Sequence, residues 1–309
     1  FTTGKIFIVK DPTDTDYNDY AAAIAPDEFF STIQLAVTAS RVGLSDYIFV
    51  APKDGAGADP WNVDANLDLG KSLVRLFGLG RGLERTLLLI DSAHAIRIGQ
   101  GATDAARVYG VELGFLNIAA SGTTVVAPVQ IADVDTYGTY IHDSAIVNLG
   151  TTAATAEITD LGKSLRVERC TIGSATAAHA DDNYVQSTGA GAAGPVEFID
   201  CHFKHFAGAV GDQFCTFITG SLDNQFRNCT FYNGNHDTNV MTVGIVSADA
   251  VANGLGVQML GCYMIGATIM ATASNSWMAP VGQGNTVLAA DIYNPGLAAD
   301  GAEPVGVDT

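Results

Sequence analysis

Basic residues are scarce in this 309-residue chain. It has 15 lysines and arginines against 33 aspartates and glutamates, which gives a formal net charge of −18. A protein that follows a phosphate backbone needs clustered cations, so this balance argues against a nucleic-acid partner. The same charge favours solubility and repels other anions, including acidic polysaccharides.

Long apolar runs are also missing. The chain has no stretch of 18 consecutive apolar residues, and it does not open with a basic, apolar and small-residue leader. We therefore expect no membrane-spanning helix and no signal peptide. Hydrophobic residues still make up 48% of the chain and charged residues only 16%, which is enough for a long core.

A short pattern recurs six times between Val111 and Met264. It reads apolar, any, apolar, any, any, small, any, apolar, and we call the sixth position the slot. The copies begin at Val111, Thr139, Leu165, Val196, Asn224 and Val257, and their slots are Leu116, Ser144, Cys170, Cys201, Cys229 and Cys262. Successive slots are 28, 26, 31, 28 and 33 residues apart by subtraction.

This spacing describes two short strands joined by a two-residue bend whose side chains both point outward. A strand-like repeat of 20 to 50 residues is typical of a solenoid, in which each coil pairs with its neighbours at ~4.8 Å. We predict one all-β domain of stacked coils. The variable segments 151–163, 174–195 and 234–256 are rich in Ala, Gly, Asp, Asn and Thr and would form loops on its sides.

The cysteines fit this interpretation without a metal or a disulfide. The count of five is odd, and no Cys-x-x-Cys pair occurs. Slot side chains in neighbouring coils would run parallel, which suits the disulfide torsion poorly. We expect reduced, buried cysteines that pack as small hydrophobic groups.

Three segments follow from this pattern. Residues 1–45 would hold a strand, an acidic turn and a capping helix, residues 46–293 a parallel β-helix, and residues 294–309 an extended C-terminal arm rich in Pro, Gly, Ala and Asp. Ser31 and Gln34 match a capping box, with Phe30 and Leu35 as a hydrophobic staple. The helix would cover the open end of the solenoid.

The order of these elements resembles the right-handed parallel β-helix proteins of the pectin-lyase-like superfamily. The stretches that carry the resemblance are FSTIQLAV at 30–37, YIFVAP at 47–52 and LVRLFGLG at 73–80. The opening strand, Asp-rich turn and helix are also similar to β-helix proteins of tailed-phage particles. The resemblance implies right-handed coils, a homotrimer and a location in the virion. The catalytic patterns of the superfamily's lyases and esterases do not match residue by residue, so none is carried over.

Two groups of acids are candidate sites. Asp14, Asp16 and Asn18 imitate the start of a calcium loop, but Asp19 stands where that loop needs glycine and Ala25 where it needs a bidentate acid. We expect a solvated acidic turn there, and no metal or other cofactor in the protein.

Asp143 and Asp200 form the second group, because they are bend residues two coils, or ~9.6 Å, apart. That separation is near the upper end of the distances found between the two catalytic carboxylates of inverting glycosidases. Arg169 between them, however, would hold both acids ionised. We expect a surface column of alternating acidic and basic side chains, which we call the charge ladder. The triad residue types in His142-Asp143-Ser144 would not form a relay, because neighbours on a strand point to opposite faces.

Our functional hypothesis is a non-enzymatic structural protein of a virus particle, a tailed-phage capsid decoration or cement protein. Its partners would be its own copies and other virion proteins such as the major capsid protein. The alternative is a polysaccharide-degrading tailspike, hydrolase or lyase, or a non-catalytic adhesin that binds surface glycan. The candidate sugar platforms are Tyr140, Tyr184, Tyr232 and Tyr263.

Overall fold

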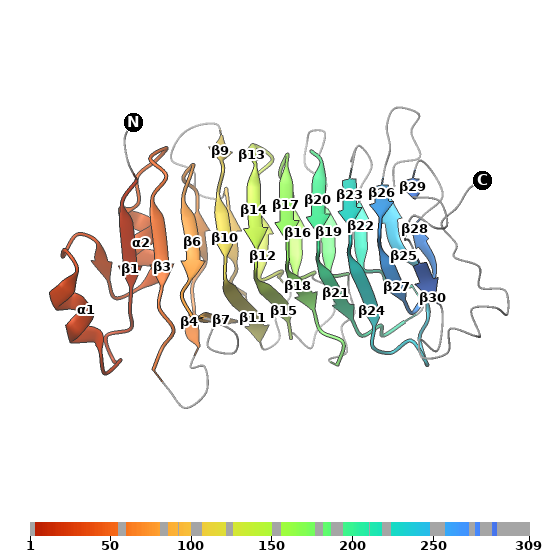
Figure 1. The fold of residues 1–309 in the computed structure, drawn as a ribbon, viewed down its shortest axis with the longest axis horizontal. Helices are drawn as coiled ribbons and strands as arrows, with labels where there is room; N and C mark the ends of the chain where they lie inside the picture. Colours follow the sequence, from red (N-terminus) through yellow and green to blue (C-terminus); the bar gives the residue numbers. More distant parts are fainter. Residues whose placement is uncertain are drawn as a thin grey trace.

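Three parallel β-sheets run along the molecule, side by side in one stack (Figure 1). The computed structural model describes residues 4–54, 60–80, 86–91, 93–99, 107–121, 126–149, 156–176, 182–186, 194–209, 211–217, 224–247, 257–271, 276–278 and 286–288. Within these residues the sheets have eleven, nine and eight strands, and we call them sheets 1, 2 and 3.

Sheet 1 contains, in spatial order, β2 (Phe29–Phe30), β1 (Ile6–Val9), β3 (Tyr47–Val50), β6 (Arg75–Gly78), β10 (Glu112–Gly114), β14 (Thr139–His142), β17 (Leu165–Glu168), β20 (Val196–Ile199), β23 (Asn224–Arg227), β26 (Val257–Leu260) and β29 (Ser276–Met278). Sheet 2 contains β4 (Trp61–Val63), β7 (Thr86–Asp91), β11 (Leu116–Ser121), β15 (Ala145–Asn148), β18 (Thr171–Gly173), β21 (His202–His205), β24 (Thr230–Asn233), β27 (Tyr263–Ile265) and β30 (Thr286–Leu288).

Sheet 3 contains β5 (Leu67–Leu69), β8 (Ile96–Ile98), β12 (Val129–Ile131), β16 (Ile158–Asp160), β19 (Tyr184–Gln186), β22 (Cys215–Phe217), β25 (Met241–Ser247) and β28 (Ala267–Ala271). A small two-stranded sheet pairs β9 (Val108–Tyr109) with β13 (Thr136–Tyr137) beside the start of β10 and β14 (Figure 1). Within the part of the chain that the structure describes, the strands pair in parallel, so the predicted all-β parallel solenoid is confirmed. Its right-handedness stays a prediction from the resemblance.

The repeat sets the register. Ile141 pairs with Val167, which pairs with Phe198, so the same pattern position stacks from coil to coil. Inward side chains form continuous columns, and the aromatic ones stack. The Phe198 and Phe226 rings lie 5.0 Å apart and almost parallel. Because each coil buries its apolar face only against its neighbours, the repeat and the core are the same feature.

Six successive bends between sheets 1 and 2, from the β10–β11 bend to the β26–β27 bend, each contain a residue with positive φ. These residues are Phe115 (58°), Asp143 (48°), Arg169 (51°), Asp200 (52°), Asn228 (52°) and Gly261 (67°). Asn, Asp and Gly tolerate this left-handed conformation better than other residues do, so four of the six positions suit it. The backbone ladder continues through the bend, since the amide of Asp143 donates to the carbonyl of Glu168 at 3.0 Å.

The slot cysteines are free and fully buried, as expected. They also contact the bend. The Sγ atoms of Cys170, Cys201, Cys229 and Cys262 lie 3.4, 3.3, 3.4 and 3.6 Å from the carbonyl oxygen two residues earlier. The Ser144 hydroxyl donates to the equivalent carbonyl of His142 at 2.8 Å. From the second copy of the pattern onward, the slot therefore holds a small side chain that can also donate a hydrogen bond to the bend, and Cys and Ser meet both needs. Leu116, the first slot, meets neither.

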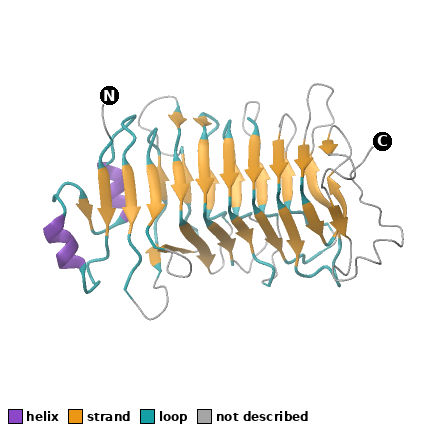
Figure 2. Ribbon diagram, viewed as in Figure 1, coloured by secondary structure: helices purple, strands orange, loops and turns teal. Residues whose placement is uncertain are grey.

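Two helices lie at the N-terminal end of the stack, α1 (Tyr17–Ala23) and α2 (Ile33–Ala39) (Figure 2). Helix α2 contacts β1, β2, β3 and β5 and buries Ile33, Ala36 and Val37, so the prediction of a helix that covers the first coil is correct. The predicted cap was one residue early, because the Thr32 hydroxyl, and not that of Ser31, accepts from the Leu35 amide at 3.2 Å. The staple prediction was also wrong, since Leu35 is exposed.

The acidic turn before α1 departs further from its prediction than the cap of α2 does. It continues into α1, which the sequence patterns did not indicate, and Asp14 is buried within it. No helix of the described residues is long and apolar enough to cross a membrane. The predicted arm at 294–309 lies outside the described residues, as do parts of the three predicted loops.

Candidate functional site

The acids proposed as a calcium loop surround a lysine. Asp14, Asp16 and Asp54 offer three carboxylate oxygens within 4.8 Å of one another. Lys10 Nζ lies 2.9 Å from Asp14 Oδ2, 2.9 Å from Asp16 Oδ1 and 3.3 Å from Asp54 Oδ1. Asn18 does not belong to this group, because it is exposed on α1. The ammonium occupies the position between the acids that a bound cation would need.

The charge of Lys10 is secured by these contacts. Burial alone would lower the pKa of Lys10, but the hydrogen bonds to Asp14, Asp16 and Asp54 raise it above the usual value. The Lys10 side chain is only 4% exposed, and its ammonium also donates to the carbonyl of Pro52 at 3.3 Å. An internal ion pair network therefore joins β1, the start of α1 and the segment after β3.

Of the candidate glycosidase acids, Asp143 is locked in an ion pair. Arg169 donates from Nε to Asp143 Oδ1 at 2.8 Å and from Nη2 to Oδ2 at 2.7 Å. These bonds, with a smaller contribution from His142, lower the pKa of Asp143 to about 2. Asp200 Oδ1 accepts a hydrogen bond from the side-chain Nδ2 of Asn228 at 3.2 Å. Arg169 lies in the coil between the two acids, as the sequence indicated, but it pairs with Asp143 and Glu168, whereas the partner of Asp200 is Asn228.

His142 joins two acids on the outer surface of sheet 1. Its Nε2 lies 3.0 Å from Glu112 Oε1, and its Nδ1 lies 2.9 Å from Asp143 Oδ2. The strand pattern did not lead us to expect this contact between the neighbours His142 and Asp143, and Asp143 stands at a bend with a left-handed φ. Ser144 points into the core and donates to the backbone, so no nucleophile completes a triad.

The predicted sugar platforms need one correction. Tyr184 is fully buried and donates to Asp160 Oδ2 at 2.8 Å, so it is not available to a ligand. Tyr140, Tyr232 and Tyr263 are partly exposed. Tyr140 donates to Glu168 Oε2 at 2.8 Å and packs 4.6 Å from the His142 ring, so it belongs to the charge ladder.

A more exposed pair of rings was not found by sequence reasoning. Tyr109 and Tyr137 stack at 5.2 Å on β9 and β13, and Tyr109 is 43% exposed. Arg107 and Lys163 lie over the Tyr137 ring at 5.9 and 5.3 Å. The spacing of 28 residues between the two tyrosines equals a slot spacing and could have indicated the pair.

Two polar residues also continue a column of sheet 3 that holds Leu69, Ile98 and Ile131 in the preceding coils. Asp160 and Gln186 are paired in register, and both are buried. Burial raises the pKa of Asp160 to about 6, although hydrogen bonds from Tyr184 and Gly162 act in the opposite direction. Within the described residues the Gln186 amide has no hydrogen-bond partner. This polar interior was not predicted from the sequence.

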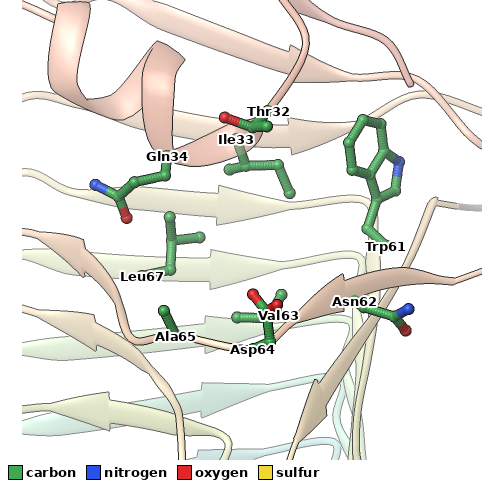
Figure 3. Close-up of a pocket in the computed structure, with 9 residues that line it drawn as sticks. All are labelled: Thr32, Ile33, Gln34, Trp61, Asn62, Val63, Asp64, Ala65 and Leu67. Atoms are coloured by element: carbon green, nitrogen blue, oxygen red, sulfur yellow. The ribbon is translucent and has the colours of Figure 1, made fainter. Parts of the chain in front are cut away.

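A pocket of about 240 Å³ lies between α2 and the first coil (Figure 3). It exists because β4 and β5 end their sheets and a short helix takes the place of a further coil. Ile33, Val63 and Leu67 form apolar walls, and Asp64 is the single ionisable residue in the lining. The pocket therefore offers no pair of groups for acid and base catalysis.

Comparisons with known proteins give one structural likeness. No family model matches the sequence, and no curated protein matches it. A solved structure, ORF18 of Geobacillus virus E2, is similar to this chain with a TM-score of 0.45 and 11% sequence identity. The likeness covers 82% of this chain and 56% of that chain, so this chain spans little more than half of its length. A likeness at this identity concerns the fold alone.

Proposed function

We propose that this protein is a non-enzymatic structural protein of a virus particle, a tailed-phage capsid decoration or cement protein that acts through protein contacts. The observation that carries the proposal is that two acids of the outer surface are held in their ionised form. Asp143 is held ionised by Arg169, and Glu168 by Tyr140 and Arg166, so neither is suited to donate a proton to a leaving group. A self-paired ladder instead stabilises the side of a rigid stack.

The viral setting comes from the resemblance of the opening strand, acidic turn and helix to phage-particle proteins. A long solenoid with a covered N-terminal end is a rigid spacer, and its sides and ends are available for contacts. The proposed partners are further copies of the chain, as a homotrimer, and virion proteins such as the major capsid protein. The proposed location is the virion, assembled in the host cytoplasm.

Purified particles test this proposal. Particles of the virus that carries this gene would be separated into capsids and tails, and an antibody against the protein would be applied to each fraction and to the unassembled lysate. We expect labelling of the capsid fraction. Labelling of tails would overturn the decoration role, and a signal confined to the unassembled lysate would overturn the structural role.

A second candidate, glycan binding, is favoured by the exposed Tyr109 and Tyr137 rings. Exposed aromatic rings bind the apolar faces of sugars, and Arg107 and Lys163 beside this pair are donors for sugar oxygens. Binding of host capsular polysaccharide would be measured by calorimetry, with Tyr109→Ala expected to weaken it and Leu149→Ala, at a side chain of similar exposure, as the control. Equal affinity in both variants would count against this site.

The same samples test cleavage. Release of reducing ends that is lost in Asp143→Asn and in Asp200→Asn would show that these acids act as a glycosidase pair and would overturn the non-enzymatic proposal. Because the pKa of Asp143 is held near 2, we expect no such release at neutral pH.

A further inference from the structure

The outer surface of sheet 1 changes character along the stack. Over β1, β3, β6, β10 and β14 it carries rings and aliphatic groups around one ion pair, Arg75–Glu112, and we call this part the aromatic face. Its rings and aliphatic side chain are those of Ile6, Tyr47, Phe49, Phe77, Tyr140 and His142, with Phe115 at the bend after β10. From β17 onward the same columns hold Arg166, Glu168, Glu197, Gln225, Arg227 and Gln258, with Ile199 and Leu260 between them. One sheet thus has an apolar half and a charged half.

The rings of the aromatic face form one continuous cluster outside the solenoid core. Phe77 lies 5.7 Å from Phe49 and 6.1 Å from Phe115, and the Phe115 ring lies 5.1 Å from that of His142. Phe77 is buried by these neighbours although it is not part of the core. Phe115 and Ile6 remain 42% and 53% exposed. Connected apolar surface of this kind typically marks an interaction site.

The charges on the aromatic face are paired within it. Arg75 Nε lies 2.9 Å from Glu112 Oε2, and Glu112 and Asp143 hold the two nitrogens of His142. Asp143 is also paired with Arg169. The face is therefore close to neutral on a chain whose net charge is −18. Two copies of such a chain repel each other, so contact costs least where the charges are already neutralised.

The aromatic face also has a shape that can fit itself. Gly4, Ile6, Ser45, Tyr47 and Phe49 line a depression of about 430 Å³ at its N-terminal end, and the Phe115 ring projects from the same face. An interface between identical subunits must present complementary features on one molecule. A recess and a projecting ring on one surface meet that requirement.

We propose that the aromatic face is a self-association surface whose occupant is a second copy of this chain. The contact would bury Phe115 and Ile6, and the charged half of sheet 1 would stay in solvent. This inference does not depend on a role in the virion, because self-association is measured on the purified protein and virion location on particles.

Sedimentation of the full chain over a wide concentration range tests the proposal. We expect a species at a multiple of 32.1 kDa, and we expect Phe115→Asn to raise the dissociation constant about tenfold or more. Asparagine suits the positive φ at this bend, as Asn228 shows at φ 52°, so the fold should be retained. Ile6→Thr, which keeps a strand-favouring residue, should weaken association in the same direction.

Leu260→Asn is the matched control, since Leu260 is also 42% exposed but lies in the charged half of sheet 1. It should leave the dissociation constant unchanged, and circular dichroism would confirm that each variant is folded. Added salt should strengthen association, because it screens the repulsion between acidic subunits. A wild-type protein that sediments at 32.1 kDa throughout, or equal weakening by Leu260→Asn, would overturn the proposal.

Discussion

Replacement of Lys10 by methionine tests whether one ammonium holds the N-terminal acids together. Methionine keeps most of the aliphatic length and removes the charge. Asp14, Asp16 and Asp54 would then face one another within 4.8 Å without a counter-charge. The change isolates the electrostatic contribution of Lys10 from its packing.

The structure sets the expected size of the effect. Removing one partner of a buried ion pair costs about 3–5 kcal/mol. Lys10 and Asp14 are 4% and 3% exposed, but Asp16 and Asp54 are each 40% exposed, so water screens part of the repulsion. We expect a loss of about 2–3 kcal/mol. The loss should be local, because coils of a solenoid interact mainly with their neighbours.

Amide hydrogen exchange measures this local stability. Protection in β1 and α1 should fall in Lys10→Met, while protection in β17 and β20 stays as in the wild type. Lys53→Met is the control, because Lys53 Nζ pairs with a single acid, Asp11, at 2.7 Å and is more exposed. It should reduce protection less than Lys10→Met does.

Calcium and pH provide two further readouts. Three converging carboxylates suit Ca²⁺ once the ammonium is gone, so millimolar calcium should restore protection in Lys10→Met and leave the wild type unchanged. The raised pKa of Lys10 means that its contribution is fully present below the unfolded value of about 10.4 and is lost as pH rises beyond it. Lys10→Met should lack that alkaline loss. Unchanged exchange in Lys10→Met, or a calcium effect in the wild type, would refute this reasoning.

Substitutions at three other positions have defined outcomes. The raised pKa of Asp160 means that the folded state binds more protons than the unfolded state between about pH 4 and 6, so Asp160 should lower stability as pH rises through that window. Asp160→Asn should remove this pH dependence and add up to about 3 kcal/mol of stability above pH 6, measured from urea midpoints. At the left-handed bend, Asp200→Ala should cost about 1 kcal/mol more than Asp200→Gly, and the reverse order would contradict the strain argument. In the slot, Cys229→Ser should be at least as stable as Cys229→Ala, because Ser144 shows that a hydroxyl can donate to the bend; a clearly better alanine variant would show that the thiol acts by packing alone.

The parts of the fold that were predictable are the parts that local pattern controls. Apolar and other side chains alternate along each strand, and this alternation decides which of them face inward. The recurrence of the pattern then aligns the inward side chains from coil to coil. Val167, Phe198 and Cys201 could therefore be placed in the core from the sequence. The sequence also located α2 through its buried face, although it placed the cap at Ser31 and not at Thr32.

The site depended on contacts that pattern does not encode. Asp54 is 44 residues from Lys10, and only the folded N-terminal end brings them together. The contact of His142 with Asp143 needs a left-handed bend, which a strand pattern does not specify. Tyrosine is common both inside and outside a solenoid, so the burial of Tyr184 and the exposure of Tyr109 could not be read from residue type.

The sequence by itself determined a stack of parallel coils with an apolar interior, small slots at the bends, alternating charges on one side and a covered N-terminal end. It could do so because the coil features recur in one short pattern along the chain, and the covering helix has an apolar face of its own. The tertiary structure alone decided that an ammonium fills the acidic cluster, that His142 contacts Asp143, and that the rings of sheet 1 gather into one face. These depend on side-chain direction and on pairing between residues far apart in sequence, which stacking creates and periodicity does not describe.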